Sequence, residues 1–132
     1  GVDKDPLNLA EFTRSQMRRT LTHELTGGSG ELSVLLLDAQ IEEAIRGAIS
    51  RTGAGSFLTL APAAGRDIVT SVKRALGDDG ASEPVILTQP DVRRFVKKLV
   101  EMDLPRAKVV SYAELLPEVR IQPIGRATLA GL

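Results

Sequence analysis

Four basic side chains lie close together in one predicted helix: Arg93, Arg94, Lys97 and Lys98. Positions i, i+1, i+4 and i+5 share one side of a helix, while the apolar residues of the same segment fall on the other side. No acidic residue interrupts the four. One interpretation is a solvated helix face, and the other is a docking patch for an acidic protein partner. We therefore single these four residues out as candidate partner-binding residues.

The glycine-containing segment 51–56 invites comparison with phosphate-binding loops. The dinucleotide pattern G-x-G-x-x-G would begin at Gly53 and would need a glycine where Leu58 stands. The segment also follows a predicted helix and precedes a predicted strand, which reverses the order that dinucleotide binding requires. The Gly-Lys-Ser/Thr of a Walker loop is absent. We expect a turn at the end of a helix, and no nucleotide cofactor.

The residues that metal or acid–base chemistry would need are scattered. His23 is the single histidine and the chain has no cysteine, so a zinc site lacks ligands. Glu42 and Glu43 stand near a predicted helix start, where carboxylates complement the helix dipole, so we interpret them as structural. The adjacent aspartates at 78–79 are expected in a polar surface loop. No Gly-x-Ser-x-Gly elbow surrounds Ser111. We expect no enzyme, no metal and no cofactor.

The elements that position these residues follow from hydrophobic periodicity. The pattern predicts a helix over 7–25, a buried strand over 32–37 and, after Asp38 as N-cap, a helix over 39–50. Strand–helix pairs follow, and then a final pair of strands. Because proline cannot donate to a central ladder, Pro123 places the last strand at a sheet edge. The remaining expected elements are 57–60, 62–76, 85–88, a helix from 89 ended by Pro105, 109–112 and 120–124.

This alternation predicts a three-layer α/β domain, with a largely parallel or mixed sheet flanked by helices and an N-terminal helical segment before it. The expected organisation is a helical segment over 1–26, a glycine-rich linker over 27–31, and the α/β domain over 32–130. A receiver domain of a signalling protein shares the alternation, and Asp38 ends a strand as its acidic residues do. Neither of the next two strand ends, at 60–61 and 88–89, supplies a phosphoacceptor carboxylate.

The overall charge argues against one class of partner, although a local basic patch remains compatible with it. Lys and Arg total 17 and Asp and Glu total 17, so the formal net charge is zero and nucleic acid is not expected as a partner. No apolar run approaches the roughly 20 residues of a membrane span. The absence of cysteine fits a reducing compartment.

Four stretches together resemble one protein family. They are "VLLLDAQIEEAIRGAI" from Val34, "GSFLTLAP" from Gly55, "PVILTQPDVRRFVKKLV" from Pro84 and "VVSYAELLPEVRIQPIGRA" from Val109. In order and spacing they resemble the C-terminal cytoplasmic region of the type III secretion export-gate family (FlhA/SctV, or FHIPEP, type). The tail "VRIQPIGRA" is more similar to the injectisome branch than to the flagellar branch. The family often has an acidic residue where this chain has Ala61.

The resemblance implies a function in protein export. The chain would come from a longer, multi-pass inner-membrane protein and would lie on the cytoplasmic face of that membrane. The segment 1–26 would end the third cytoplasmic subdomain, and 32–130 would form the fourth. The implied partners are other copies of the protein in a nonameric ring, export chaperone–substrate and gatekeeper complexes, and other export-apparatus proteins. The alternative is a receiver-like α/β signalling or protein-interaction domain of a soluble protein.

Overall fold

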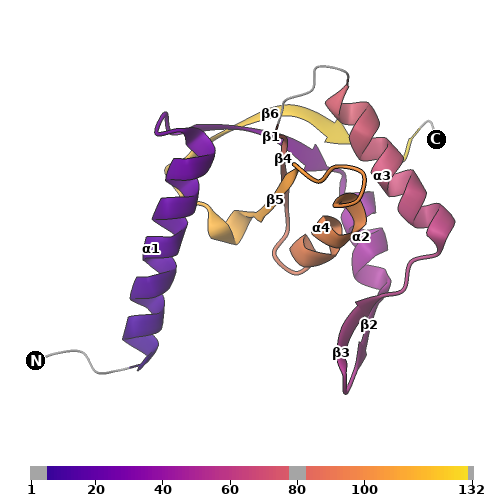
Figure 1. Cartoon of the computed structure of the whole chain (residues 1–132), viewed down its shortest axis with the longest axis horizontal. Coiled ribbons are helices and arrows are strands. Elements are labelled where there is room, and N and C mark those ends of the chain that lie inside the picture. The colour runs from indigo at the N-terminus through magenta and orange to yellow at the C-terminus, as the bar shows by residue number, and fades with distance from the viewer. Residues whose placement is uncertain (1–5, 78–82, 131–132) are drawn as a thin grey trace, which may run out of the picture.

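The computed structural model describes residues 6–77 and 83–130, with residues 6–15 described by their backbone alone (Figure 1). The helices are α1 (Pro6–Thr26), α2 (Ala39–Gly47), α3 (Pro62–Leu76), α4 (Arg93–Val100) and the short 3₁₀ helix η1 (Tyr112–Glu114). The strands are β1 (Glu31–Leu37), β2 (Ile49–Thr52), β3 (Gly55–Leu58), β4 (Val85–Thr88), β5 (Lys108–Ser111) and β6 (Arg120–Ala127). The predicted polar surface loop with the aspartates at 78–79 lies outside the described residues.

The main sheet has four parallel strands in the order β5-β4-β1-β6. All four residues of β4 are buried, as is typical of a central parallel strand covered on both faces. The strands β5 and β6 follow one another in sequence but form opposite edges of the sheet. Pro123 therefore lies in an edge strand, as predicted. The extra residue Ile124 is accommodated by a register shift opposite Val34 and Leu35.

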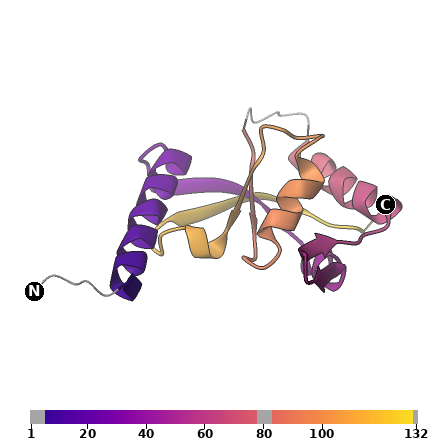
Figure 2. The ribbon, with the colours of Figure 1, turned by 60° about the horizontal axis from the view of Figure 1, so that its bottom comes forward.

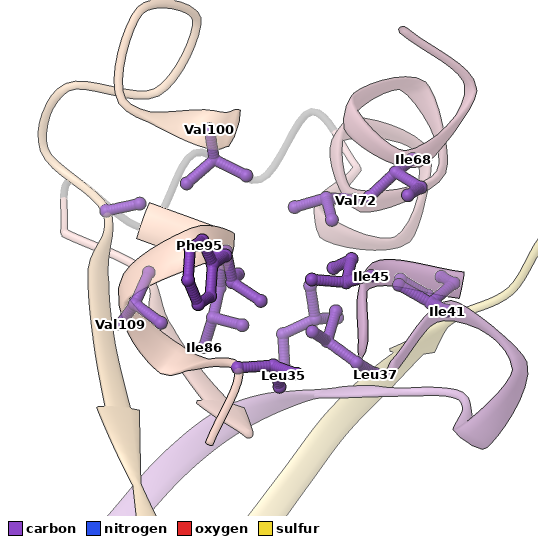
Figure 3. Close-up of a cluster of buried hydrophobic side chains, with 14 residues drawn as sticks. Leu35, Leu37, Ile41, Ile45, Ile68, Val72, Ile86, Phe95, Val100 and Val109 are labelled. Carbon is purple, nitrogen blue, oxygen red and sulfur yellow. The ribbon is translucent and has the colours of Figure 1, made fainter. Parts of the chain in front are cut away.

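The larger core lies on one face of this sheet, beneath α2, α3 and α4. Figure 3 shows strand residues such as Leu35 and Ile86 meeting Ile45, Val72 and Phe95 from the three helices. Alternate strand residues point to the two faces, so their neighbours in sequence serve the other side. This arrangement confirms the predicted α/β fold with a largely parallel sheet flanked by helices.

A second, smaller core covers the opposite face. Val34, Leu87 and Val110 point there, and Leu21 and Leu25 of α1 pack against the cluster they form. The connection from β5 to β6 crosses the same face, and its Leu116 N–H donates to the hydroxyl of Thr22 at 3.2 Å. Figures 1 and 2 show α1 on one side of the sheet and the other long helices on the opposite side. The last turns of α1 thus supply the third layer.

The predicted helix over 39–50 is too long, and the segment 57–60 is not a strand of the main sheet. Helix α2 does begin at Ala39, with the Asp38 side chain accepting from the Gln40 N–H, but it ends at Gly47. Ile49 pairs with Leu58 in the antiparallel hairpin β2–β3, which forms a separate two-stranded sheet. The segment 51–56, expected as a turn after a helix, is therefore the outer part of a hairpin, with paired residues on either side of a turn at 53–54. The apolar spacing would allow α2 to continue through Ile49, but the pairing of β2 with β3 ends the helix before that residue.

Helix α4 also starts later than predicted. The segment 89–92 forms a turn in which Val92 N–H bonds to Gln89 O at 3.3 Å, and the helix begins at Arg93. Val92 is fully buried in the larger core, so this turn is anchored before the helix starts. The anchoring sets the rotation of α4 and with it the directions of its basic side chains.

The turn between α1 and β1 depends on glycine. Gly27, Gly28 and Gly30 all have positive φ, a conformation that other residues adopt at a cost. The Ser29 hydroxyl donates to Thr26 O at 2.9 Å, and the Arg120 N–H donates to Gly30 O at 2.8 Å. The latter bond joins the turn to the start of β6.

Candidate docking surface

The four candidate partner-binding residues form two rows on α4. Arg93 and Lys97 are spaced i, i+4 and face the edge strand β5, while Arg94 and Lys98 form the next row and are exposed. The buried side of α4 carries Phe95, Val96 and Val100 in the larger core. The helix is therefore held by its apolar side, as predicted, but its cations do not form a single strip.

The inner row is bound to the backbone of β5. Arg93 Nη1 donates to Val109 O at 3.2 Å, and Lys97 Nζ donates to Ala107 O at 2.9 Å. Arg93 Nε also lies 3.5 Å from a carboxylate oxygen of Glu114. The same carboxylate oxygen accepts from the Ser111 N–H at 2.9 Å, closing a capping box around η1. The inner row thus covers backbone groups along the edge strand.

The outer row is free of such backbone contacts in the described part of the chain. The Arg94 guanidinium lies 4.7 Å from the centre of the Phe95 ring, a cation–π distance. Lys98 has a side chain that is 78% exposed and lies 3.9 Å from Glu101. Both side chains are thus exposed to solvent.

A hollow of about 580 Å³ follows β5 between α1 and α4. Leu21 and Leu25 form its apolar side. Its cations are Arg93, Lys97, Arg106 and Lys108, and its carboxylates are Glu83 and Glu114. Lys108 Nζ lies 3.6 Å from Glu83. Arg106 and Lys108 were not predicted as site residues. Their alternate spacing at the start of a short strand does indicate that basic side chains lie along one side of that strand.

A second hollow of about 480 Å³ lies on the other side of α4, between α3 and the β2–β3 hairpin. Leu58, Val69 and Leu99 line it, with Met102, which is 88% exposed, and Lys98 at its rim. Helix α4 therefore separates a basic hollow from a more apolar one.

A polar network fixes the position of the turn that precedes α4. Glu42 of α2 accepts from the Thr88 hydroxyl at 2.7 Å and from the Gln89 N–H at 2.9 Å. Arg46 of the same helix donates two hydrogen bonds to the Asp91 carboxylate. This contact lowers the pKa of the Asp91 carboxyl and raises the pKa of the Arg46 guanidinium. Glu43 pairs with Arg46 as well. Glu42 and Glu43 thus have structural roles, as the sequence indicated.

The other chemistry-bearing residues do not come together. Within the described residues, no group of three His, Cys, Asp or Glu side chains is arranged to hold a metal ion. His23 is exposed near Gly28, and the Asp38 carboxylate caps α2. Of the helices in the described ranges, none has the length and apolarity to cross a membrane. The chain is thus an α/β domain whose main sheet has basic side chains along the edge strand β5.

The chain belongs to the FHIPEP family, whose sequence profile matches residues 1–120. It is the injectisome type of the type III secretion export-gate family that the four stretches resemble. It is 39% identical over 127 residues to protein hrpC2 of Xanthomonas euvesicatoria and 36% identical over 129 residues to low calcium response locus protein D of Yersinia pestis. Each match covers 96% of this chain and 20% or 18% of the relative, so the chain spans about a fifth of their length.

Solved structures share the fold. The CdsV protein of Chlamydia pneumoniae matches with a TM-score of 0.81 and 43% identity over 96% of this chain and 37% of that one. A second structure of CdsV is of its complex with CdsO, with a TM-score of 0.79 over 96% of this chain and 38% of that one. The nonameric SctV-C of EPEC matches with a TM-score of 0.76 and 30% identity over 94% of this chain and 37% of that one.

Proposed function

We propose that this chain is the C-terminal cytoplasmic part of the inner-membrane export gate of a bacterial type III secretion system, of the injectisome branch. The observation that carries the proposal is the likeness to CdsV, which extends over 96% of the chain at 43% identity. The chain would act at the cytoplasmic face of the inner membrane as a binding module, without catalytic residues or cofactors. In this proposal 1–26 ends the third cytoplasmic subdomain, 27–31 is a linker and 32–130 is the fourth.

The whole protein would assemble as a homo-oligomeric ring. Support comes from the EPEC relative, whose structure is nonameric. The ring would present many copies of the same surface to each arriving complex. Repetition raises the effective concentration of a weak site, so each copy needs only modest affinity.

The partners would be export chaperone–substrate and gatekeeper complexes and other export-apparatus proteins. The CdsV–CdsO complex supports a partner of the last kind. The docking surface would be the basic side of α4, with Arg93, Arg94, Lys97 and Lys98, extended by Arg106 and Lys108. Such a charged surface mainly speeds encounter and selects partners of opposite charge.

The test uses the full-length protein in a secreting strain and measures export together with partner association rates. Replacing Arg94 and Lys98 by glutamate should lower the association rate about tenfold at low salt, with the loss shrinking as salt rises. The matched control replaces the exposed Arg51 on the β2–β3 hairpin by glutamate, and that change should leave the rate unaltered. Unchanged export and unchanged rates in a stable, ring-forming double variant would refute the docking role of this face.

A further inference from the structure

The strand β5 forms an edge of the main sheet, and its outward backbone groups are identifiable. The Lys108 N–H donates to Pro84 O at 2.8 Å, so residue 108 faces β4. Successive residues of a strand direct their backbone groups to opposite sides, so Ala107, Val109 and Ser111 face outward. An edge of this kind is a template for another strand unless it is covered.

Outward backbone groups along β5 form hydrogen bonds with side chains rather than with another strand. Lys97 Nζ binds Ala107 O, Arg93 Nη1 binds Val109 O, and Glu114 accepts from the Ser111 N–H. In the part of the chain that the structure describes, the outward N–H of Val109 has no hydrogen-bond partner. The two cations come from the solvent-accessible side of α4, and the side chain of Arg93 is 38% exposed. Flexible side chains of this kind are displaced more easily than a paired strand.

From this arrangement we propose that β5 accepts an extended acidic segment of a protein partner as an added strand. The incoming N–H groups would take over Ala107 O and Val109 O, and an incoming carbonyl would accept from the Val109 N–H. Arg93 and Lys97, released from the backbone, would pair with carboxylates on the α4 side of the segment. Apolar side chains, alternating with these carboxylates, would face Leu21 and Leu25 in the hollow beside α1.

Charge argues for an acidic segment as the occupant. The hollow along β5 has four cations and two carboxylates, so an acidic strand is attracted there. A second copy would bring its own Arg106 and Lys108 if it paired through β5, or Arg120, Pro123 and Arg126 if it paired through β6. Like charges oppose both pairings, and Pro123 supplies no N–H.

The inference rests on the proposed docking function and specifies its binding mode. The probe is a peptide of about eight alternating Glu and Val residues, a sequence that favours an extended strand. On binding, amide hydrogen exchange at Val109 should slow about tenfold or more, because that N–H becomes bonded. A peptide with methyl groups on its edge-facing nitrogens keeps the charge but loses the donors, and it should bind at least about tenfold more weakly.

Variants of the two rows on α4 give the matched comparison. The change Arg93→Gln with Lys97→Gln should abolish the preference for the Glu-Val peptide over a Gln-Val peptide, whereas Arg94→Gln with Lys98→Gln should retain it. Equal binding of the methylated peptide, or unchanged exchange at Val109 in the wild-type chain, would overturn the inference. Protection of Val109 that rises with protein concentration alone would also overturn it, because the occupant would then be a second copy. None of these three results bears on ring assembly or on the export assay, which test the proposed function separately.

Discussion

Glu42 and Thr88 join two separate elements, since the carboxylate on α2 accepts a hydrogen bond of 2.7 Å from the hydroxyl at the end of β4. Thr88 is fully buried. Replacing Glu42 by alanine leaves that hydroxyl without its acceptor, so unfolding free energy should fall by about 1–3 kcal/mol. Denaturant unfolding measures this. The neighbouring Glu43→Ala change removes a more exposed carboxylate and should cost less than about 0.5 kcal/mol. Equal losses in the two variants would show that the bond to Thr88 contributes little.

The pair of Arg46 and Asp91 should make stability depend on acid. The hydrogen bond from Arg46 holds the pKa of Asp91 below its ordinary value of 3.8 in the folded state. The unfolded chain therefore takes up the proton first as the pH falls. The contribution to stability is present above that ordinary value and is lost as pH falls through the lower folded pKa. The difference in melting temperature between wild type and Asp91→Asn should shrink from about pH 6 to about pH 3. A constant difference would contradict the assignment.

Helix α3 lacks a side-chain cap at its N-terminus. Ala61 has the extended conformation of an N-cap residue, φ −60 and ψ 143, before Pro62, but it has no oxygen to accept a hydrogen bond. Ala61→Asp should raise the unfolding free energy by about 0.5–2 kcal/mol. Ala61→Val suits the same backbone and offers no acceptor, so it should give no gain. Thermal melts of both variants measure the difference, and equal melting temperatures would rule out capping.

The two lysines at the end of α4 should differ in their effect on folding. Lys97 bonds to Ala107 O, so Lys97→Glu should lower the unfolding free energy by about 1 kcal/mol. Lys98 is mostly exposed, so Lys98→Glu should stay within about 0.5 kcal/mol of wild type. Denaturant titrations of the two single variants provide the comparison. A loss at Lys98 as large as that at Lys97 would contradict the separate roles of the two rows.

The glycine turn after α1 should be a preferred site for limited proteolysis. Three of its glycines have positive φ, and its residues from 27 to 30 are exposed. Cleavage in a time course should occur within 26–31 before the segment 32–77 is cut, as mass spectrometry of the fragments would show. Initial cleavage within β1 or α3 would place the boundary elsewhere.

The sequence predicted the elements whose burial pattern is local. The apolar runs of β1 and β4, and the stripe containing Ile68 and Val72, needed no knowledge of distant partners. The β2–β3 hairpin was missed because Ile49 continues the helical stripe of Ile41 and Ile45. Only the pairing of Ile49 with Leu58 reveals the strand.

The basic residues show a similar limit. Helical spacing placed Arg93, Arg94, Lys97 and Lys98 near one another, and the structure agrees. Spacing within a helix carries no information about the neighbouring element. The carbonyls of Ala107 and Val109 lie beside only one row, and that contact separates Arg93 and Lys97 from the other two.

The order of strands in the main sheet has a kinetic consequence. Among the strands that the structure describes, the interior strand β1 is synthesised first and its partner β6 last, with Leu37 opposite Ala127. Until β6 emerges, one side of β1 is an unpaired and largely apolar edge. Pairings so distant in sequence are slow to form, because a long loop must close before they contribute stability. Nascent chains should therefore depend on a chaperone, or on rapid completion of synthesis, to avoid aggregation through β1.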